Sequence, residues 1–373
     1  LDVTVQKSVL ELLANLQAQT KMGLMFITHD LGLVQDIAHK VVVMYKGEIV
    51  EQNNTRHLFS HPVHPYTKAL LACRPILYPG GKRLPVVSDF LQSPETEPVI
   101  PVDAPSPAEK IPALTTRSPL LKIADLTVAY ATKKNLLGKP VNQFKAVDGI
   151  SFDILEGETL GVVGESGCGK TTLGRAMLRL LPATKGQILY RGTDLAKLSE
   201  VEMKRLRKEI QVVFQDPFAS LNPRITVGEA IREAMAVHGL FENNVQRRDK
   251  VVQLLEKVNL QADHYNRYPH AFSGGQRQRI GIARALALSP GFIVFDESVS
   301  ALDVSVQAQV LNLINELKAE FGFTAMFISH DLGVVKYISD RILVMNQGKL
   351  EEIGPAEAVF HQPVSDYTKR LLE

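Results

Sequence analysis

The segment GETLGVVGESGCGKTTLGRAML holds the residues of this chain that are best suited to bind phosphate. Its turn fits the pattern GxxxxGK[ST] at Gly164, Gly169, Lys170 and Thr171. Glycines let backbone N–H groups converge on phosphate oxygens, the start of a helix adds positive charge, and the lysine reaches the outer phosphates. An apolar strand before the turn and an amphipathic helix after it favour this interpretation over an ordinary glycine-rich turn. We therefore predict a nucleotide-phosphate site with a threonine hydroxyl available to Mg²⁺.

Two carboxylates follow a second apolar run. Asp296 and Glu297 come directly after Phe292–Phe295, at the expected C-terminal end of a strand, where open α/β sheets bind ligands. Asp296 is suited to hold Mg²⁺ through a water, and Glu297 is placed to orient and deprotonate an attacking water. An Asp-Glu pair after a strand is by itself more often an ordinary strand end. The phosphate loop in the same domain favours the catalytic interpretation.

The segment AFSGGQRQRIGIARALALS predicts a helix that begins at Ser273. Ser273 with Gln276 three residues later is the pattern of a capping box. Taken alone, this is a well-capped helix. A helix that opens on Ser-Gly-Gly also leaves its first N–H groups accessible, which is a second possible anion site in a chain that already has one.

Apolar runs that alternate with helical patterns predict the sheet that carries these loops. The expected strands are 158–163, 209–214, 291–296, 323–329 and 341–346. Between Gln215 and Ser273 the pattern is helical, with a second capping box at Thr226 and Glu229. The sequence therefore predicts a largely parallel α/β sheet with a helical insertion.

The chain repeats itself at one fixed offset. Leu1 aligns with Leu302 and Tyr66 with Tyr367, and each pair lies 301 positions apart. An ungapped match of this length indicates a duplicated domain and not a short structural repeat. We expect the first copy to lack its upstream part, so that the chain is an N-terminally truncated piece of a longer tandem protein.

The repeat divides the chain into three expected parts. Residues 1–74 are the C-terminal fragment of a first domain, and residues 120–373 are a complete second domain. Residues 75–119 hold ten of the twenty prolines of the chain, mixed with Ser, Thr and Glu, which predicts a linker.

Composition limits the class of protein. The chain has 373 residues, 45% of them apolar, and 42 basic against 40 acidic side chains, so charge gives no argument for nucleic acid. Two cysteines exclude a disulfide framework and fit a reducing compartment. No apolar run is long enough to span a bilayer, so any membrane role would act through a partner.

The motifs GESGCGKT, VFQDP, FSGGQRQR, IVFDES, SALD and FISHD, in this order, resemble the nucleotide-binding domain of ABC ATPases over about residues 120–373. The resemblance implies a P-loop NTPase fold: a mostly parallel sheet, an antiparallel ATP-binding subdomain and an inserted α-helical subdomain at about 216–285. It also implies ATP hydrolysis by two domains that stack head to tail, so that each ATP lies between the phosphate loop of one domain and the SGGQ helix of the other.

The resemblance implies a role for each residue that matches a family motif. Tyr130 matches the aromatic side chain that stacks on adenine. The other implied ATP-binding residues are Gly164, Glu165, Ser166, Gly167, Cys168, Gly169, Lys170, Thr171 and Thr172. The implied Mg²⁺ ligands are Thr171, Gln215 and, through a water, Asp296. The signature residues that would reach the nucleotide of a partner domain are Ser273, Gly274, Gly275 and Gln276.

Glu297, Gln215 and His330 are the implied catalytic residues. Gln215 matches the glutamine that senses Mg²⁺ and the attacking water, and His330 matches the switch histidine that contacts the γ-phosphate. A lone histidine after a strand is usually structural, but its twin His29 in the same context, FITHD, favours a functional role. Asp303 matches the aspartate that links the two ATP sites across the domain interface.

Three residues depart from the family pattern. Cys168 occupies a position that small residues usually hold in the phosphate loop, which suggests sensitivity to thiol reagents. Phe272 replaces the usual leucine before SGGQ, and Ser298 replaces the proline that commonly follows the catalytic glutamate. None of the three removes a catalytic group.

Two similar tails, LFSHPVHPYTKALL and VFHQPVSDYTKRLL, follow the two histidines. They resemble the C-terminal extension of ATPase subunits from importers of dipeptides, oligopeptides and glutathione, some of which are tandem fusions. In the second copy the extension is expected at about 354–373, where SDYT departs from the fuller HPYT pattern. Several members carry an iron-sulfur cluster there, but Cys73 alone cannot support one, so no cluster is expected.

The resemblance implies that ATP hydrolysis powers peptide import through a separate permease. The implied partners are ATP, two membrane permease subunits, a second ABC domain from the missing half or another chain, and indirectly a periplasmic or extracellular binding protein, with no nucleic acid. The implied location is peripheral, on the cytoplasmic face of the inner or plasma membrane.

Two other functions stay open from the sequence. A soluble tandem ABC ATPase that acts on ribosomes or DNA would share the duplication, although linkers of that class are typically long, charged and helical. The chain could also be only a binding or structural module, because its first copy lacks a phosphate loop, a signature and both carboxylates. Co-purification with permease subunits or with ribosomes would separate the transporter from the soluble class.

Overall fold

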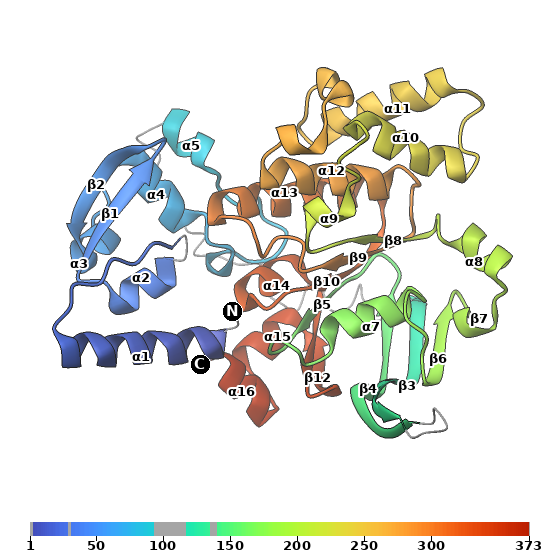
Figure 1. Cartoon of the computed structure of the whole chain (residues 1–373), viewed down its shortest axis with the longest axis horizontal. Helices are drawn as coiled ribbons and strands as arrows, with labels where there is room; N and C mark the ends of the chain where they lie inside the picture. The colour runs from blue at the N-terminus through green and yellow to red at the C-terminus, as the bar shows by residue number, and fades with distance from the viewer. Residues whose placement is uncertain (1–2, 29–30, 93–116, 135–139, 373) are drawn as a thin grey trace.

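The largest sheet has six strands in the order β12-β11-β5-β10-β9-β8. The computed structural model describes residues 3–28, 31–92, 117–134 and 140–372 (Figure 1). The strands are β5 (Thr159–Val163), β8 (Ile210–Val213), β9 (Phe292–Asp296), β10 (Thr324–Ile328), β11 (Arg341–Asn346) and β12 (Lys349–Pro355). The first five are parallel, and β12 pairs antiparallel with β11. The five strands predicted from the sequence are confirmed to within one residue at each end.

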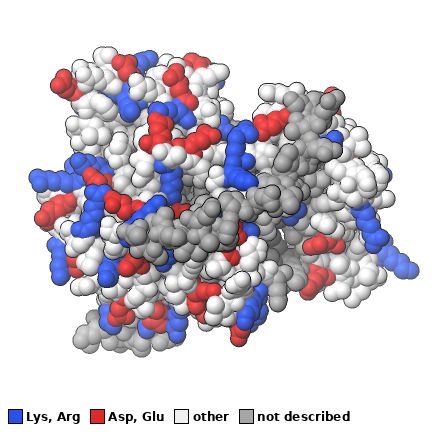
Figure 2. All heavy atoms as spheres, turned by 180° about the vertical axis from the view of Figure 1, so that it is seen from behind, with Lys and Arg blue, Asp and Glu red and all other residues white. Residues whose placement is uncertain are grey.

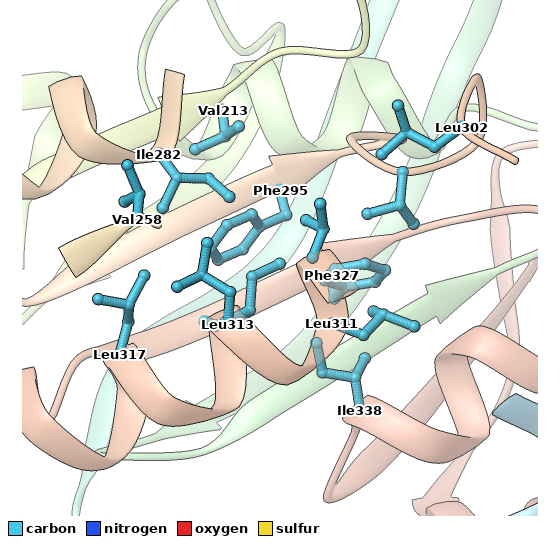
Figure 3. Packing of buried hydrophobic residues seen from close by; sticks show 14 of the residues in the cluster. Val213, Val258, Ile282, Phe295, Leu302, Leu311, Leu313, Leu317, Phe327 and Ile338 are labelled. Carbon is cyan, nitrogen blue, oxygen red and sulfur yellow. The ribbon is translucent and has the colours of Figure 1, made fainter. Parts of the chain in front are cut away.

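Both faces of this sheet are covered. On β9, Ile293 and Phe295 belong to one hydrophobic core, while Phe292 and Val294 belong to the other. Alternate residues of a strand point to opposite faces, so a sheet buried on both sides needs continuous apolar strands. Figure 3 shows the first core, where Phe295 and Phe327 of the sheet pack near helix residues such as Leu313. The sheet is thus a rigid support for the loops at its strand ends.

Helices α7 (Lys170–Met177), α13 (Val304–Phe321) and α14 (Leu332–Ile338) each follow a strand of this sheet. They begin immediately after the loops that carry the predicted phosphate-binding and catalytic residues. α7 contributes to one core and α13 and α14 to the other, so the loops lie between a buried strand and a buried helix. Their positions are therefore fixed at both ends.

A second, antiparallel sheet precedes and follows the phosphate loop in the sequence. Its strands, in the order β4-β3-β6-β7, are β3 (Pro119–Lys134), β4 (Pro140–Leu155), β6 (Lys185–Tyr190) and β7 (Thr193–Asp194). The 3₁₀ helix η3 (Leu195–Lys197) and helix α8 (Glu200–Leu206) connect it to β8. This sheet places Tyr130 opposite Phe144 on neighbouring strands.

The chain between β8 and β9 is helical, as predicted. Its elements are α9 (Pro217–Ser220), α10 (Val227–Val237), α11 (Asn244–Lys257), η4 (Ala262–Asn266), η5 (Pro269–Ala271) and α12 (Gly274–Leu286). α10, α11 and α12 gather at one side of the molecule (Figure 1). The capping box expected at Thr226 is only half formed: its hydroxyl accepts the N–H of Glu229, but the Glu229 carboxylate binds Arg232 and Tyr265 instead.

Helices and strands recur in the structure at the offset of the sequence repeat. The first copy has α1 (Val3–Thr20), α2 (Leu31–Ile37), β1 (Lys40–Tyr45), β2 (Glu48–Asn54), α3 (Thr55–Ser60) and α4 (Pro65–Ala72). Each begins 301 residues before its counterpart among α13, α14, β11, β12, α15 (Ala356–His361) and α16 (Asp366–Leu372). The counterpart of β10 is the exception, because residues 21–28 form no strand.

Part of the predicted linker is ordered. Residues 75–92 contain the 3₁₀ helix η1 (Pro75–Leu77) and helix α5 (Val87–Gln92), and Leu84 and Phe90 are buried in the first core. Proline content gave no sign of this packing, because the buried side chains are few and irregularly spaced. Residues 93–116 of the predicted linker lie outside the described residues, and its last residue, Pro119, begins β3. Among the described residues, no helix combines the length and apolarity needed to cross a membrane.

Candidate functional site

The glycines of the phosphate loop are required by the backbone. Gly164, Gly167 and Gly169 all have positive φ, at 149°, 80° and 109°. A Cβ on Gly164 would lie 2.2 Å from the carbonyl oxygen of Met345, and one on Gly169 would lie 2.0 Å from that of Ala146. Any other residue type would clash with backbone at both positions. The loop thus packs directly against its neighbours while its N–H groups stay at the start of α7.

Lys170 is held by the loop itself. Its side chain is 4% exposed, and Nζ donates hydrogen bonds to the carbonyl oxygens of Gly164 and Glu165 at 2.7 and 2.9 Å. The charged ammonium therefore replaces water with backbone acceptors. These carbonyls fix the cation beside the phosphate loop.

Thr171 and Asp296 bring the phosphate loop and the first carboxylate together. The Thr171 hydroxyl donates to Oδ1 of Asp296 at 2.9 Å, across 125 positions of sequence. Asp296 is 4% exposed, and burial raises its pKa, although the hydrogen bond from Thr171 opposes the shift. The result is a threonine hydroxyl beside a buried carboxylate at the C-terminal end of β9.

The side chain of Glu297, after β9, meets side chains from two other strand ends. Gln215, after β8, donates from Nε2 to Oε2 of Glu297 at 2.9 Å. His330, after β10, places Nδ1 3.6 Å from the same oxygen. The interaction with His330 lowers the pKa of Glu297 despite partial burial of the carboxylate. Glu297 itself has a φ of 47°, a left-handed conformation that is uncommon outside glycine, asparagine and aspartate.

A pocket of about 200 Å³ lies over the phosphate loop. Its lining is Tyr130, Phe144, Ala146, Gly167, Gly169, Lys170, Thr171, Thr172 and Glu297. Predicted adenine-stacking, phosphate-binding and catalytic residues thus share one cavity. Phe144 is a lining residue that the sequence analysis missed; its pairing opposite Tyr130 on β4 becomes apparent only once the two strands are in register.

The remaining predicted phosphate-loop residues lie beside this cavity. Gly164 and Glu165 accept the Lys170 hydrogen bonds, and Cys168 Sγ lies 3.9 Å from Lys170 Nζ. Gly164, Glu165, Ser166 and Cys168 are not among the lining residues within the described chain.

The SGGQ helix starts with the capping box that the sequence predicts. Ser273 Oγ accepts the N–H of Gln276, and Gln276 Oε1 accepts the N–H of Ser273 at 3.0 Å. A Cβ on Gly275 would lie 2.3 Å from Val306, so this glycine allows α12 to approach α13 closely. Within the described chain, Ser273, Gly274, Gly275 and Gln276 contribute nothing to the lining of the phosphate pocket. Any phosphate they contact would have to come from elsewhere.

Asp303 caps α13. Its Oδ1 accepts hydrogen bonds from the N–H groups of Ser305 and Val306 at 3.1 and 3.0 Å. The side chain is exposed while it caps the helix. His29 and Asp2, the first-copy counterparts of His330 and Asp303, lie outside the described residues.

One contact of the phosphate loop comes from the far end of the chain. Tyr367 on α16 accepts the N–H of Glu165 through its hydroxyl at 3.3 Å. Burial raises the pKa of Tyr367 to about 12, so the hydroxyl remains protonated near neutral pH. No pattern in the sequence connects these residues, which are 202 positions apart.

Two families match different parts of the chain. Residues 147–300 match the family described as ABC transporter, and residues 50–98 match the family described as oligopeptide/dipeptide transporter, C-terminal region. The first match includes the phosphate loop, the SGGQ helix and both carboxylates. The chain contains an ABC transporter domain. The ABC match ends directly before the second copy of the repeated segment, 302–372, and the other match begins in the first copy and continues to residue 98.

Curated relatives match the whole chain. The glutathione import ATP-binding proteins GsiA of Escherichia coli strain K12 and Pectobacterium atrosepticum are 46% and 44% identical to it over 377 and 373 aligned residues. In both cases the match covers 100% of this chain and 59% of the relative. The chain therefore spans about three fifths of the length of these relatives.

Solved ABC cassettes share the fold. A dimeric structure of the bacterial ABC transporter cassette MJ0796 matches with a TM-score of 0.56 and 26% identity, covering 63% of this chain and 98% of that one. A second structure of the same cassette, bound to ADP and Pi in a post-hydrolysis state, matches equally well. The structure of cbiO1 from Clostridium perfringens gives 25% identity and the same TM-score. The ABC nucleotide-binding fold expected from the motifs is confirmed.

Proposed function

We propose that the ABC domain, residues 120–373, hydrolyses ATP. The observation that carries the proposal is the position of Glu297, which lines the phosphate pocket and receives a hydrogen bond from Gln215. Its lowered pKa keeps the carboxylate ionised at neutral pH, and an ionised carboxylate can accept a proton from water. Glu297 is thus the proposed general base, with Gln215 and His330 holding its carboxylate in place.

The lining of the pocket supports the proposed contacts to ATP. Tyr130 and Phe144 are 43% and 56% exposed, which is unusual for aromatic side chains and leaves their faces available to a base. Lys170 and the N–H groups at the start of α7 supply positive charge for the phosphates. The adenine end and the phosphate end of the proposed site therefore lie on different sheets of the same domain.

Mg²⁺ fits the residues at the phosphate end. The Thr171 hydroxyl, the Asp296 carboxylate and the Gln215 amide supply the oxygen ligands that this ion prefers, and Asp296 is a buried carboxylate that a cation would stabilise in its charged form. When bound, the ion would neutralise charge on the phosphates. Thr171, Gln215 and, through a water, Asp296 would hold it.

The proposed catalytic unit contains two ABC domains. Ser273, Gly274, Gly275 and Gln276 begin a capped helix whose first residue, Ser273, is exposed, and none of them lines the pocket of its own domain within the described chain. A second domain that presents its phosphate loop would give these N–H groups a ligand. In this arrangement Asp303 lies at the junction of the two sites.

The proposed role of hydrolysis is to power import of peptides, either di- and oligopeptides or glutathione-like molecules, through a separate membrane permease. Support comes from the names of the relatives, which are glutathione import proteins, and from the peptide-transporter region at residues 50–98. The proposed partners are two permease subunits and, indirectly, an external binding protein. The proposed location is the cytoplasmic face of the membrane.

Surface charge fits this role better than a role on nucleic acid. On the face in Figure 2, basic and acidic side chains are interspersed among the described residues. Nucleic-acid-binding surfaces usually concentrate Lys and Arg on one face. The overall balance of 42 basic and 40 acidic residues agrees.

The test is ATP hydrolysis by this chain over a wide range of protein concentrations. We expect specific activity to rise with concentration, because two ABC domains from two chains must meet to form the shared sites. Glu297→Gln is the matched control, since it keeps the hydrogen-bonding shape of the side chain and removes its basicity. It should lower turnover by roughly a hundredfold or more while ATP still binds.

Two results would argue against the proposal. Equal activity in Glu297→Gln would mean that another residue is the base or that the activity comes from a contaminant. ATP binding without turnover at every concentration would mean that this chain is a nucleotide-binding module only. The proposed association with a permease would be tested by co-purification with permease subunits.

A further inference from the structure

Residues 75–90 lie against two helices of the ABC domain, α13 and α14. Leu84 is fully buried and Phe90 is 2% exposed, and both belong to the same core as helix residues of the ABC domain. At the start of α14, a Cβ on Gly333 would lie 2.8 Å from Cβ of Ile76, so this glycine makes room for η1. Buried side chains of the segment and a glycine of α14 therefore both contribute to this contact.

The side chain of Asn312 on α13 binds the backbone of Leu84 twice. Asn312 Nδ2 donates to the Leu84 carbonyl at 2.8 Å, and the Leu84 N–H donates to Asn312 Oδ1 at 2.8 Å. Asn312 is only 7% exposed, so its amide would lose free energy without these partners. The amide pairs with both the N–H and the C=O of one residue, as a residue of a neighbouring antiparallel strand would, and this recognises an extended backbone.

Tyr337 on α14 makes a second backbone contact two residues earlier. Its hydroxyl donates to the Lys82 carbonyl at 2.6 Å and receives a hydrogen bond from Asn315 at 3.1 Å. Tyr337 is 1% exposed, so its hydroxyl also depends on buried partners. A Cβ on Gly80 would lie 2.8 Å from the Tyr337 carbonyl oxygen, which again requires a glycine in the docked segment.

The first copy of the repeat lacks the recognising side chains. At the offset of 301 positions, Asn312 corresponds to Glu11 and Tyr337 to Asp36, and both acidic side chains are exposed. A carboxylate accepts hydrogen bonds but cannot donate to a backbone carbonyl. Neither side chain could therefore donate to a docked carbonyl from α1 or α2, although these helices are the counterparts of α13 and α14.

We propose that residues 75–90 are a docking segment through which the tail of the first copy recognises the α13–α14 face of the second copy, and that this recognition is one-way. The occupant is the transporter C-terminal region at residues 50–98, which contains the segment. α13 begins after Asp303 and α14 begins beside His330, so the segment joins the two helices that carry the proposed interface and switch residues. It ties the first copy to the back of the ATP site.

Amide hydrogen exchange of the full chain tests the proposal. Asn312→Leu keeps a similar volume and removes both hydrogen bonds to Leu84. We expect exchange across residues 82–86 to accelerate by about tenfold or more, while α13 and α14 stay within about twofold of the parent chain. Asn312→Glu, which introduces the first-copy residue, should give the same result if recognition is one-way.

Matched variants separate docking from general destabilisation. Phe90→Ser should also accelerate exchange across 82–86, whereas Leu91→Ser should not, because Leu91 is its exposed neighbour at 39%. Unchanged protection in Asn312→Leu would overturn docking through this amide, and protection kept in Asn312→Glu would overturn the one-way recognition. If Asn312→Leu also accelerates exchange in α13, Tyr337→Phe is the deciding variant. Faster exchange confined to residues 82–86 in Tyr337→Phe supports the proposal, and unchanged exchange there overturns it.

Discussion

Glu297 illustrates what residue types can and cannot predict. Its place after an apolar run, with a phosphate loop elsewhere in the domain, was enough to predict a carboxylate at a ligand-binding edge. The partners Gln215 and His330 followed only from the family resemblance, since they lie 82 and 33 positions away along the chain. The left-handed backbone of Glu297 could not be predicted, because it arises where the chain turns sharply out of the sheet.

Cys168 shows a residue whose environment changes its expected chemistry. Its position beside Lys170 suggested a reactive thiol, and Lys170 does favour the thiolate. Burial outweighs that effect and raises the pKa of Cys168, and burial raises the pKa of Cys73 to about 12. Reactivity follows the thiolate fraction, which falls about tenfold for each unit of pKa above the pH.

Both cysteines should therefore resist thiol reagents in the folded chain. At about pH 8 we expect labelling with a chromogenic disulfide to be on the order of a hundredfold slower than in the urea-unfolded chain. The unfolded sample provides the reference rate in the same buffer. A folded-state rate within about threefold of that reference would show that the thiols are exposed and that Cys168 is reactive after all.

At the scale of elements, strands were the most predictable part of the fold. The central strands are mostly apolar because both faces are buried, and this pattern is visible without the structure. The Thr226 cap was predicted in part only: the sequence supplied the right residue types, but Arg232 and Tyr265 compete for the Glu229 carboxylate. Tertiary partners of this kind have no local signal.

The packing of α12 on α13 gives a prediction with an internal control. Gly275→Ala places a Cβ 2.3 Å from Val306, so we expect a loss of about 1 to 3 kcal/mol in the free energy of unfolding. Gly281→Ala lies in the same helix with no atom within 4 Å of the new Cβ, so we expect a gain of about 0.5 to 1 kcal/mol.

Urea denaturation of the two α12 variants measures both effects through the midpoint at constant slope. Because both changes add the same methyl group to one helix, the difference between them isolates the contact with α13. Equal stability of the two variants would mean that the helices are not packed as closely as the structure has them.

At the scale of the whole molecule, the sequence reveals the duplication but not that equivalent segments fold differently in the two copies. The segment equivalent to β10 has the same apolar character in both copies. In the second copy Met326 and Ile328 are fully buried, whereas in the first copy Met25 and Ile27 are 83% and 89% exposed. β10 pairs with β5 and β9, and within the described residues the first copy has only the two-stranded sheet of β1 and β2.

Amide exchange should separate the two equivalent segments. We expect residues 24–28 to exchange at least about a hundredfold faster than residues 325–328, because only the latter have strand partners on both sides. Both segments are read in one experiment on one sample. Slow exchange at 24–28 would indicate that the segment pairs with a strand from another chain.

The proline-rich part of the chain shows what composition cannot predict. Proline content predicted a linker over 75–119, yet residues 75–92 pack into the core through a few buried side chains and two backbone contacts. Those contacts depend on Asn312 and Tyr337, which lie more than two hundred positions away. Composition averages over a segment, whereas docking depends on single residues and their distant partners.

The hydrogen bond between Tyr367 and the N–H of Glu165 has a further consequence for the last helix. Coupling between two sites is reciprocal: the free energy by which one site changes the other acts equally in the opposite direction. If α16 helps to set the shape of the phosphate loop, then filling that loop must change how firmly α16 is held, by the same amount. The stability of α16 would then report whether nucleotide occupies the phosphate loop, and a protein that binds α16 would sense that occupancy.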